Sequence, residues 1–435
     1  MNTIPIELEE WQTLSPLDCE SLSNVNLEGH SSARRIAAEL TSSGRFELQE
    51  LLQGIKLRTS SYVGRLILGP LSITIRPKLR GAPLLTLLRY AYALRNFSLY
   101  DLVHYAKTDF AFQDLLIYQF SQEMEELLRR GIHREYERRA DLLSSPRGRI
   151  DMNSYARSAQ HTRTRLPVLH YPRLSDTLIN RVLRAGISLS TSLTDEMELK
   201  ARLRGLDRIL SMEVRPIQLN TDVLLRAERQ LDRRTSAYLP SFRIIKMLFD
   251  GSGIDFDEVH AGVRLPGMLF DMNRFFQMLI SRFFHEHLEG YVVEDEYRLK
   301  NLFSYDPDYN PKGKKLPKLR PDFIIKKDGA IVAILDAKYR DLWEKDFPSY
   351  MLYQLSLYAL SRNECDRAVI LYPTLSEFAT EQHIAIHEPL YGTGRAKVIL
   401  RPVKLLYLEN LLRDEHTADN WRRRVEFAKW MVFGD

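Results

Sequence analysis

The chain has 435 residues, of which 44% are hydrophobic, 27% charged and 10% aromatic, as expected of a globular protein rather than a disordered or collagen-like one. The formal net charge of +5 permits a polyanionic partner but does not require one. No apolar run approaches the ~18 residues of a membrane span, and the acidic N-terminus does not resemble a signal peptide. Cys19 and Cys365 form no metal or redox motif, so we expect a reduced, cytoplasmic protein without membrane association.

Residues 1–110 are predicted to form a β-rich domain. A short helix is expected over residues 32–43, followed by strands between residues 46 and 79. Two strand-like runs flank Gly69-Pro70, and Ile73 and Ile75 alternate with polar residues, which is typical of a half-buried strand. Pro83 could lie in the first turn of a following helix.

Residues 111–250 are predicted to be mainly helical. Apolar residues recur at helical spacing over residues 113–130, and further helices are expected over residues 176–193, 195–212 and 237–249. The glycines around Ser252 mark the expected linker to a third domain, residues 251–435.

In this third domain the pattern predicts the order helix, strand, β-hairpin, helix, strand. The helices are expected over residues 271–287 and 349–361, the first strand over 291–302, and the last over 367–372, where Pro373 should end it. The overall fold class is therefore α+β, or mixed.

Residues 319–339 carry the strongest functional signal and are predicted to form the β-hairpin. Two apolar runs flank Asp328-Gly329, a characteristic hairpin turn. Because strand side chains alternate between faces, Asp336 and Lys338 share one face.

The turn decides whether Asp322 joins that face. A two-residue loop would place Asp322 opposite Leu335, on the wrong face. A three-residue loop that starts at Lys327 would place it opposite Ile334, diagonal to Asp336. We predict the three-residue loop, with Gly329 in the left-handed position.

Two carboxylates on one face repel each other unless a cation lies between them. Oxygen ligands suit Mg²⁺, so Asp322 and Asp336 are candidate metal ligands. Lys338 could orient water or stabilise charge that develops on phosphorus. The pattern predicts a metal-dependent phosphodiesterase; the simpler interpretation is an ion pair on a solvated strand of a structural or binding module, although these charges interrupt an apolar strand.

The motif Pro321-Asp322 … Asp336-Ala337-Lys338 resembles the active site of the PD-(D/E)xK nuclease superfamily. Gln354 and Tyr358 resemble the Gln-x-x-x-Tyr element of such nucleases. Other stretches resemble McrC, the nuclease subunit of McrBC-type modification-dependent restriction systems; they lie at residues 62–64, 73–78, 147–150, 269–276 and 335–339.

This resemblance implies an Mg²⁺-dependent DNA endonuclease with Asp322, Asp336, Lys338 and Gln354 in catalysis. It implies a partner, an McrB-like AAA+ GTPase hexamer, that recognises a modified base in double-stranded DNA and binds the GTP. The N-terminal domain would dock on that partner and stimulate its GTPase, with Arg65, Arg76 and Lys78 as candidate contacts.

Candidate DNA contacts lie beside the catalytic face. Lys318 and Arg320 precede the hairpin and could bind phosphates without regard to sequence, and Tyr358 is assigned to DNA contact with them. The sequence contains no G-x-x-x-x-G-K-[ST] motif, so no nucleotide site is expected in this chain.

One position departs from the family pattern. Gln277 stands where the helix usually carries an acid after its paired aromatic residues. This departure leaves open a second interpretation, a non-catalytic or weakly catalytic activator of the AAA+ GTPase.

Overall fold

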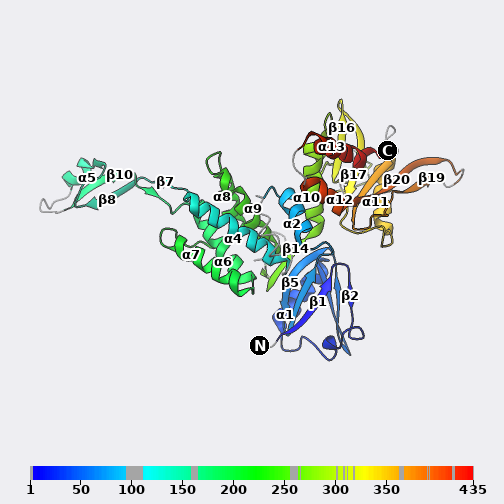
Figure 1. Cartoon of the computed structure of the whole chain (residues 1–435), viewed down its shortest axis with the longest axis horizontal. Helices are drawn as coiled ribbons and strands as arrows, with labels where there is room; N and C mark the ends of the chain where they lie inside the picture. Colours follow the sequence, from blue (N-terminus) through cyan, green and yellow to red (C-terminus); the bar gives the residue numbers. More distant parts are fainter. Residues whose placement is uncertain are drawn as a thin grey trace. The chain divides into compact units, whose positions relative to one another are not determined.

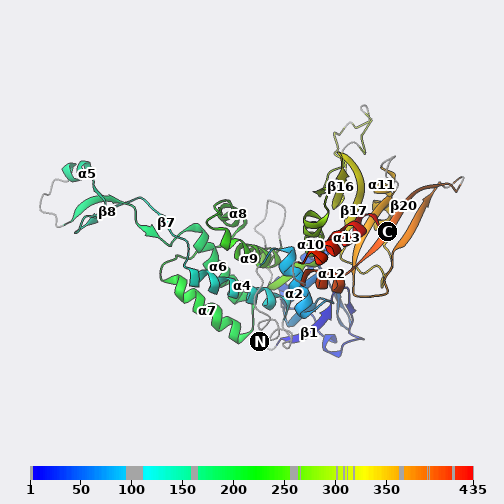
Figure 2. The same cartoon turned by 45° about the horizontal axis from the view of Figure 1, so that its top comes forward.

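A computed structural model of the whole chain (Figures 1 and 2) describes residues 3–94, 111–157, 165–254, 263–264, 266–299, 302–306, 309–310, 312–316, 319–361, 367–388, 390, 392–413 and 417–434. The fold is mixed α/β. Within these ranges no helix is long and apolar enough to cross a membrane.

Contacts divide the chain into two compact units, residues 1–109 with 269–435, and residues 110–268. The N-terminal and C-terminal segments therefore share one unit, whereas the sequence predicts three consecutive regions. The expected linker at Ser252 does not separate units, because α9 and the short strand β12 enclose it. Long-range contacts of this kind leave no local pattern in a sequence.

The N-terminal part of the first unit holds two small sheets. Strand β1 runs parallel to β6, and β5 pairs antiparallel with β6. Strand β14 joins the same sheet beside β5 and leads directly into α10. The elements are β1 (Ile4–Glu9), β2 (Thr13–Leu14), a 3-10 turn (Glu20–Leu22), α1 (Ser31–Ser42), β3 (Phe46–Leu51), β4 (Gly54–Thr59), β5 (Tyr62–Leu68), β6 (Leu71–Arg76), α2 (Gly81–Ala91) and β14 (Gly267–Asp271).

The C-terminal part of this unit is built on a six-stranded sheet in the order β15-β16-β17-β18-β20-β19. Strands β15, β16 and β17 pair antiparallel, and β17, β18 and β20 run parallel. The elements are α10 (Met272–His287), β15 (Val292–Asp295), β16 (Phe323–Lys327), β17 (Ala330–Ala337), α11 (Ser349–Leu360), β18 (Arg367–Thr374), β19 (Gln382–His387), β20 (Gly394–Lys404), α12 (Leu405–Arg413) and α13 (Ala418–Phe433).

Both faces of this sheet are covered over the central strands β16, β17 and β18, which carry continuous buried apolar runs. On one face, α11 packs against Ile324, Ile334 and Ile370. On the other face, Phe284 of α10 packs edge-to-face against Phe323, with ring centroids 5.6 Å apart. The sheet is therefore sandwiched between α11 and α10, as Figure 1 shows.

Strand β18 continues through Pro373, where the sequence predicted its end. Pro373 pairs in register with Val403 of β20. Two residues earlier, the carbonyl of Leu371 accepts from the Lys338 N–H on the β17 side. The backbone of Pro373, two residues further along the strand, faces the same side as that of Leu371. The pairing of β17 with β18 ends at Leu371, so no β17 residue lies opposite Pro373. The missing N–H of proline therefore costs no ladder hydrogen bond.

The second unit is a group of helices with a projecting β arm, residues 132–175 (Figures 1 and 2). The helices are α4 (Phe112–Arg130), α6 (Leu178–Leu193), α7 (Met197–Ser211), α8 (Thr221–Arg229) and α9 (Leu239–Gly251), with a 3-10 turn at Ser236–Tyr238. The arm holds β7 (Glu135–Tyr136), β8 (Arg139–Leu143), β9 (Arg149–Ile150), α5 (Met152–Arg157), β10 (Leu166–His170) and β11 (Arg173–Leu174); β12 (Gly253–Ile254) and β13 (Val263–Arg264) form a separate pair.

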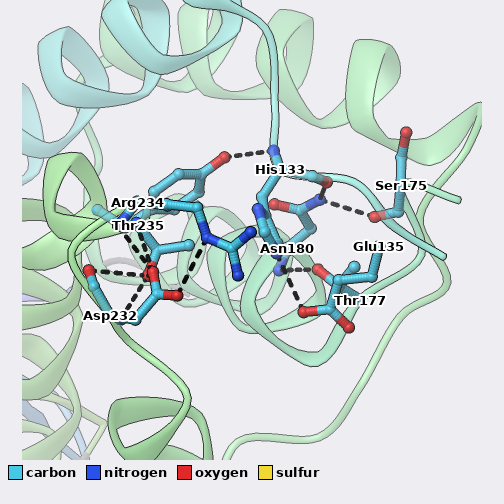
Figure 3. Close-up of polar contacts among 9 residues, drawn as sticks. His133, Glu135, Ser175, Thr177, Asn180, Asp232, Arg234 and Thr235 are labelled. Carbon is cyan, nitrogen blue, oxygen red and sulfur yellow. Dashed lines mark hydrogen bonds and ion pairs between the residues drawn. The ribbon is translucent and has the colours of Figure 1, made fainter. Parts of the chain in front are cut away.

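The two strands at the root of the arm are joined through one buried side chain, shown in Figure 3. The amide Nδ2 of Asn180 donates to the carbonyls of His133 and Ser175, each at 2.7 Å. The N–H of His133 donates to the Tyr238 hydroxyl at 2.5 Å. Thr177 caps α6 by accepting from the Asn180 N–H. These bonds hold the outgoing and returning strands together where they leave the helices.

Candidate active site

The hairpin of β16 and β17 forms as predicted, but its register differs. Lys327 pairs with Ala330, so the loop has two residues, Asp328 and Gly329. Their φ angles of 50° and 82° fit a type I′ turn, which needs positive φ at both positions. The predicted three-residue loop is therefore wrong.

A β-bulge restores the common face. Ile325 pairs with Ala333 while Lys326 pairs with Ile331, so Val332 is the extra residue. Phe323 then pairs with Leu335, and continuing this register places Asp322 opposite Asp336 instead of opposite Ile334. The two carboxylates are directly across from each other.

Three charged groups meet at the end of β17. The Nζ of Lys338 lies 2.8 Å from Asp336 Oδ2 and 3.7 Å from Asp322 Oδ2. The side chain of Asp336 is 2% exposed, and its Oδ1 is buried with no hydrogen-bond donor in the described part of the chain. A buried carboxylate oxygen without a donor is unfavourable unless something else binds it.

Asp322 is held in place from two sides. Its Oδ2 accepts from the Ala337 N–H at 2.8 Å, and its Oδ1 accepts from Nε2 of Gln277 at 3.1 Å. Gln277, the position that departs from the family pattern, thus contacts the candidate metal ligand. An amide at this point donates a hydrogen bond where an acid would repel the carboxylate.

Electrostatics within the group follow from burial and proximity. Burial, and then the negative charge of Asp336, raise the pKa of Asp322 to about 7, against the opposing effects of Lys338 and the Ala337 N–H. For Lys338 burial disfavours the charged form, but the two carboxylates outweigh it and raise the pKa above its ordinary value. The lysine therefore stays protonated while Asp322 titrates near neutral pH.

Helix α11 covers the face that bears this group. Nε2 of Gln354 donates to the Tyr358 hydroxyl at 2.7 Å. Burial raises the pKa of Tyr358 to about 12, and the charges of Asp336, Lys338 and Asp322 also act on it. Tyr358 is completely buried, which argues against the predicted DNA contact and favours a role in orienting Gln354.

The other residues predicted to contact DNA or the partner do not gather at one place. Lys318 lies outside the described residues. Arg320 forms an ion pair with Glu296 at 3.0 Å. Arg76 pairs with Glu7 at 2.8 Å and its side chain is 12% exposed, while Arg65 donates to Ser72 at 3.4 Å. Lys78 lies beside the end of β17, in a cleft. The partner contacts of Arg65, Arg76 and Lys78 stay predictions.

Asn273 is a site residue that the sequence reasoning did not single out for a role. Its Oδ1 accepts from the N–H of Tyr339 at 3.2 Å, and its Nδ2 donates to Ser61 Oγ at 2.6 Å. It therefore ties the residue after Lys338 to α10 and to Ser61, the residue before β5. The only sequence signal was its place in the Asp271-Met272-Asn273 stretch, whose aspartate caps α10.

Fold and site together define a mixed α/β protein in which two facing carboxylates and a lysine lie at the end of a central sheet. No curated protein matches this chain. The family described as "McrBC 5-methylcytosine restriction system component" matches residues 57–373, and the chain belongs to that family.

Two solved structures from Thermococcus gammatolerans are similar. A chain in a half-complex of McrB AAA+ hexamers with bound McrC gives a TM-score of 0.65 at 20% identity, covering 98% of this chain and 100% of that one. A chain in the cryo-EM structure of the McrBC complex gives 0.48 at 19% identity, covering 66% and 88%. The first likeness supports an McrC-like fold.

Proposed function

We propose that this chain is the DNA endonuclease subunit of a modification-dependent restriction complex, with a PD-(D/E)xK active site that uses Mg²⁺. The observation that carries the proposal is the meeting of Asp322, Asp336 and Lys338 within ion-pair distance at the end of an otherwise apolar strand. The order of α10, three antiparallel strands, α11 and β18 also supports the proposal, because the sequence pattern predicts the same order of helix, strand, β-hairpin, helix and strand.

The residues present fit a divalent cation. Asp336 offers a buried oxygen without a donor, and Asp322 lies opposite it. Both supply hard oxygen ligands, which Mg²⁺ prefers. When bound, the ion would supply Lewis-acid activation of the phosphodiester and of water. The described residues contain no third His, Cys, Asp or Glu grouped with these two, so water and substrate oxygens would complete the coordination.

The side chains have distinct roles in this proposal. Lys338, kept protonated by the carboxylates, donates hydrogen bonds to the attacking water and to the phosphoryl oxygens. Gln277 and the Ala337 N–H fix the orientation of Asp322. Tyr358 fixes Gln354, whose amide is then positioned at the edge of the site.

We further propose that the chain works with an McrB-like AAA+ GTPase that selects the DNA. A solved structure with this fold is described as McrB hexamers with bound McrC. Because the sequence has no phosphate-binding loop motif, the GTP belongs to the partner.

Cleavage of DNA that carries the modified base tests the proposal. With the partner, GTP and Mg²⁺ present, we expect Asp336→Ala and Lys338→Ala to abolish cutting while GTP hydrolysis by the partner is still stimulated. Asp328→Asn, in the exposed turn of the same hairpin, is the matched control and should cut normally, because asparagine tolerates the φ of 50° at this position. Persistent cutting by both active-site variants would refute the assignment.

A second function is favoured by Gln277, which stands where the family pattern usually has an acid and which donates a hydrogen bond to Asp322. If the wild-type chain stimulates GTP hydrolysis but does not cut DNA at any Mg²⁺ concentration, the chain is an activator rather than a nuclease. Restoration of cutting by Gln277→Glu would identify this position as the cause.

A further inference from the structure

A second charged cluster lies in a cleft beside the end of β17, within the first unit. The cleft is lined by the ends of β1 and β6, by the loop after β17 and by the end of β18. Its charged and aromatic side chains include Glu10, Trp11, Lys78, Arg340, Asp341 and Lys345, and Tyr339 and Thr374 also line it. None of these residues has a part in the proposed cleavage chemistry.

Positive charge dominates this cleft. Within the described residues, Lys78, Arg340 and Lys345 make no ion pair with a carboxylate, and Nε of Arg340 is buried without an acceptor. Burial, followed by the charges of Lys78 and Arg340, lowers the pKa of Lys345. Three cations therefore face one another at a mutual electrostatic cost.

The two acids of the cleft neutralise these cations poorly. Glu10 is 3% exposed, and burial raises its pKa to about 7. Its Oε1 already accepts from the Lys78 N–H and the Tyr339 hydroxyl. Asp341 accepts from Thr374 Oγ1 and from the Trp343 N–H, both at 3.0 Å. Oε1 of Glu10 and both oxygens of Asp341 are thus committed to local hydrogen bonds, while Oε2 of Glu10 is buried with no donor among the described residues.

Trp11 holds two of the cations at one place. It adopts φ of 62°, a left-handed conformation that is unfavourable for a bulky residue and is typical of functional sites. Its ring lies 5.5 Å from Arg340 Cζ and 5.8 Å from Lys345 Nζ, and its carbonyl accepts from Lys345 Nζ at 3.0 Å. The strained backbone positions the cations rather than relieving their repulsion.

We propose that Lys78, Arg340 and Lys345 form a phosphate-binding site that takes a backbone phosphate of the DNA being cut. An oxyanion would relieve the repulsion among the three cations and would satisfy the guanidinium of Arg340. DNA is the source that fits the location, because Arg340 follows the candidate catalytic Lys338 by only two residues.

Tyr339, between those two residues, is fixed through its hydroxyl by Glu10 and through its N–H by Asn273. A phosphate bound in the cleft is therefore held at a fixed position relative to the cutting site. This inference rests on the proposed nuclease function and adds a substrate contact to it.

The test is binding of a fluorescent DNA duplex to the full chain, by anisotropy in EDTA to prevent cleavage, over a series of NaCl concentrations. We expect Arg340→Gln and Lys345→Gln each to weaken binding and to reduce the slope of log K against log salt by about 0.9, the value for one lost phosphate contact. Lys345→Arg keeps the charge and should keep the slope. Arg58→Gln, at a side chain that is 68% exposed in β4, is the matched control.

Each outcome decides the proposal. The proposal is overturned if the slopes of Arg340→Gln and Lys345→Gln match that of the Arg58→Gln control. If sodium pyrophosphate stabilises the wild type while these slopes are unchanged, the cleft is a site for free anions and the proposal is also overturned. If Asp336→Ala still cuts DNA with the partner, GTP and Mg²⁺ present while the slopes of Arg340→Gln and Lys345→Gln fall, the catalytic assignment fails and the phosphate site stands.

Discussion

Replacing Asp322 by asparagine should stabilise the metal-free protein at neutral and alkaline pH. Burial and Asp336 raise the pKa of Asp322 from 3.8 to about 7, which means that ionising this side chain is unfavourable in the folded state. Since one pKa unit corresponds to ~1.4 kcal/mol, the full cost is about 4 kcal/mol. Asparagine is nearly isosteric, and its oxygen can still accept from the Ala337 N–H.

The sign of the pH dependence follows from proton linkage. Between pH 4 and 7 the folded protein binds the Asp322 proton more tightly than the unfolded chain does, so wild-type stability falls as pH rises through this window. The penalty is absent below pH 4, where both states are protonated, and is complete above pH 7. The stability gain of Asp322→Asn should therefore grow from near zero at about pH 4 to a few kcal/mol at about pH 8.

Urea unfolding in EDTA at several pH values measures this difference. Asp328→Asn is the control, because Asp328 is exposed in the turn and asparagine tolerates its positive φ; its effect should be small and independent of pH. A wild type more stable than Asp322→Asn at pH 8, or a difference that does not change with pH, would refute the assigned burial and charge repulsion.

Three further changes test the surroundings of the site and the arm. Gln277→Glu places a carboxylate against Asp322 and should lower the metal-free stability at pH 8 by about 1–3 kcal/mol. Mg²⁺ should raise the melting temperature of this variant more than that of the wild type. An equal rise would place position 277 outside the metal site. Tyr358→Phe removes the acceptor of the Gln354 amide. It should lower the free energy of unfolding in urea by about 1 kcal/mol and reduce the cleavage rate. Unchanged cleavage would mean that Gln354 does not act in the site. Asn180→Ala breaks both bonds at the root of the arm and should lower stability by about 2–4 kcal/mol and speed proteolysis of the arm, whereas the exposed Asn153→Ala should change neither.

The sequence predicts elements well where a pattern is local. The helix predicted over residues 271–287 is α10, which Asp271 caps. The helix predicted over residues 113–130 is α4, which covers residues 112–130. Strand β15 is shorter than predicted, ending at Asp295; Glu296 then adopts φ of 47°, which strand propensities do not reveal.

The site shows the limit of such reasoning. Alternation correctly placed Asp336 and Lys338 together, and chemistry suggested that Asp322 would join them. The bulge at Val332 that brings Asp322 there has no signature in the apolar run, because Val332 and its neighbour Ile331 are equally good strand formers and nothing in the sequence marks one of them as the extra residue. Gln277 and Asn273 reach the hairpin from α10 through contacts 45 and 66 residues apart in sequence, and only the tertiary fold could reveal them.

The position of a bound metal tests the central claim most directly. Crystals of the chain grown with Mn²⁺ in place of Mg²⁺ should show an anomalous peak between the carboxylates of Asp322 and Asp336, about 2.0–2.3 Å from an oxygen of each. The peak should disappear in Asp336→Ala. A fully occupied metal elsewhere in the chain, or none at these carboxylates at millimolar Mn²⁺, would contradict the assignment of this hairpin as a metal-dependent cutting site.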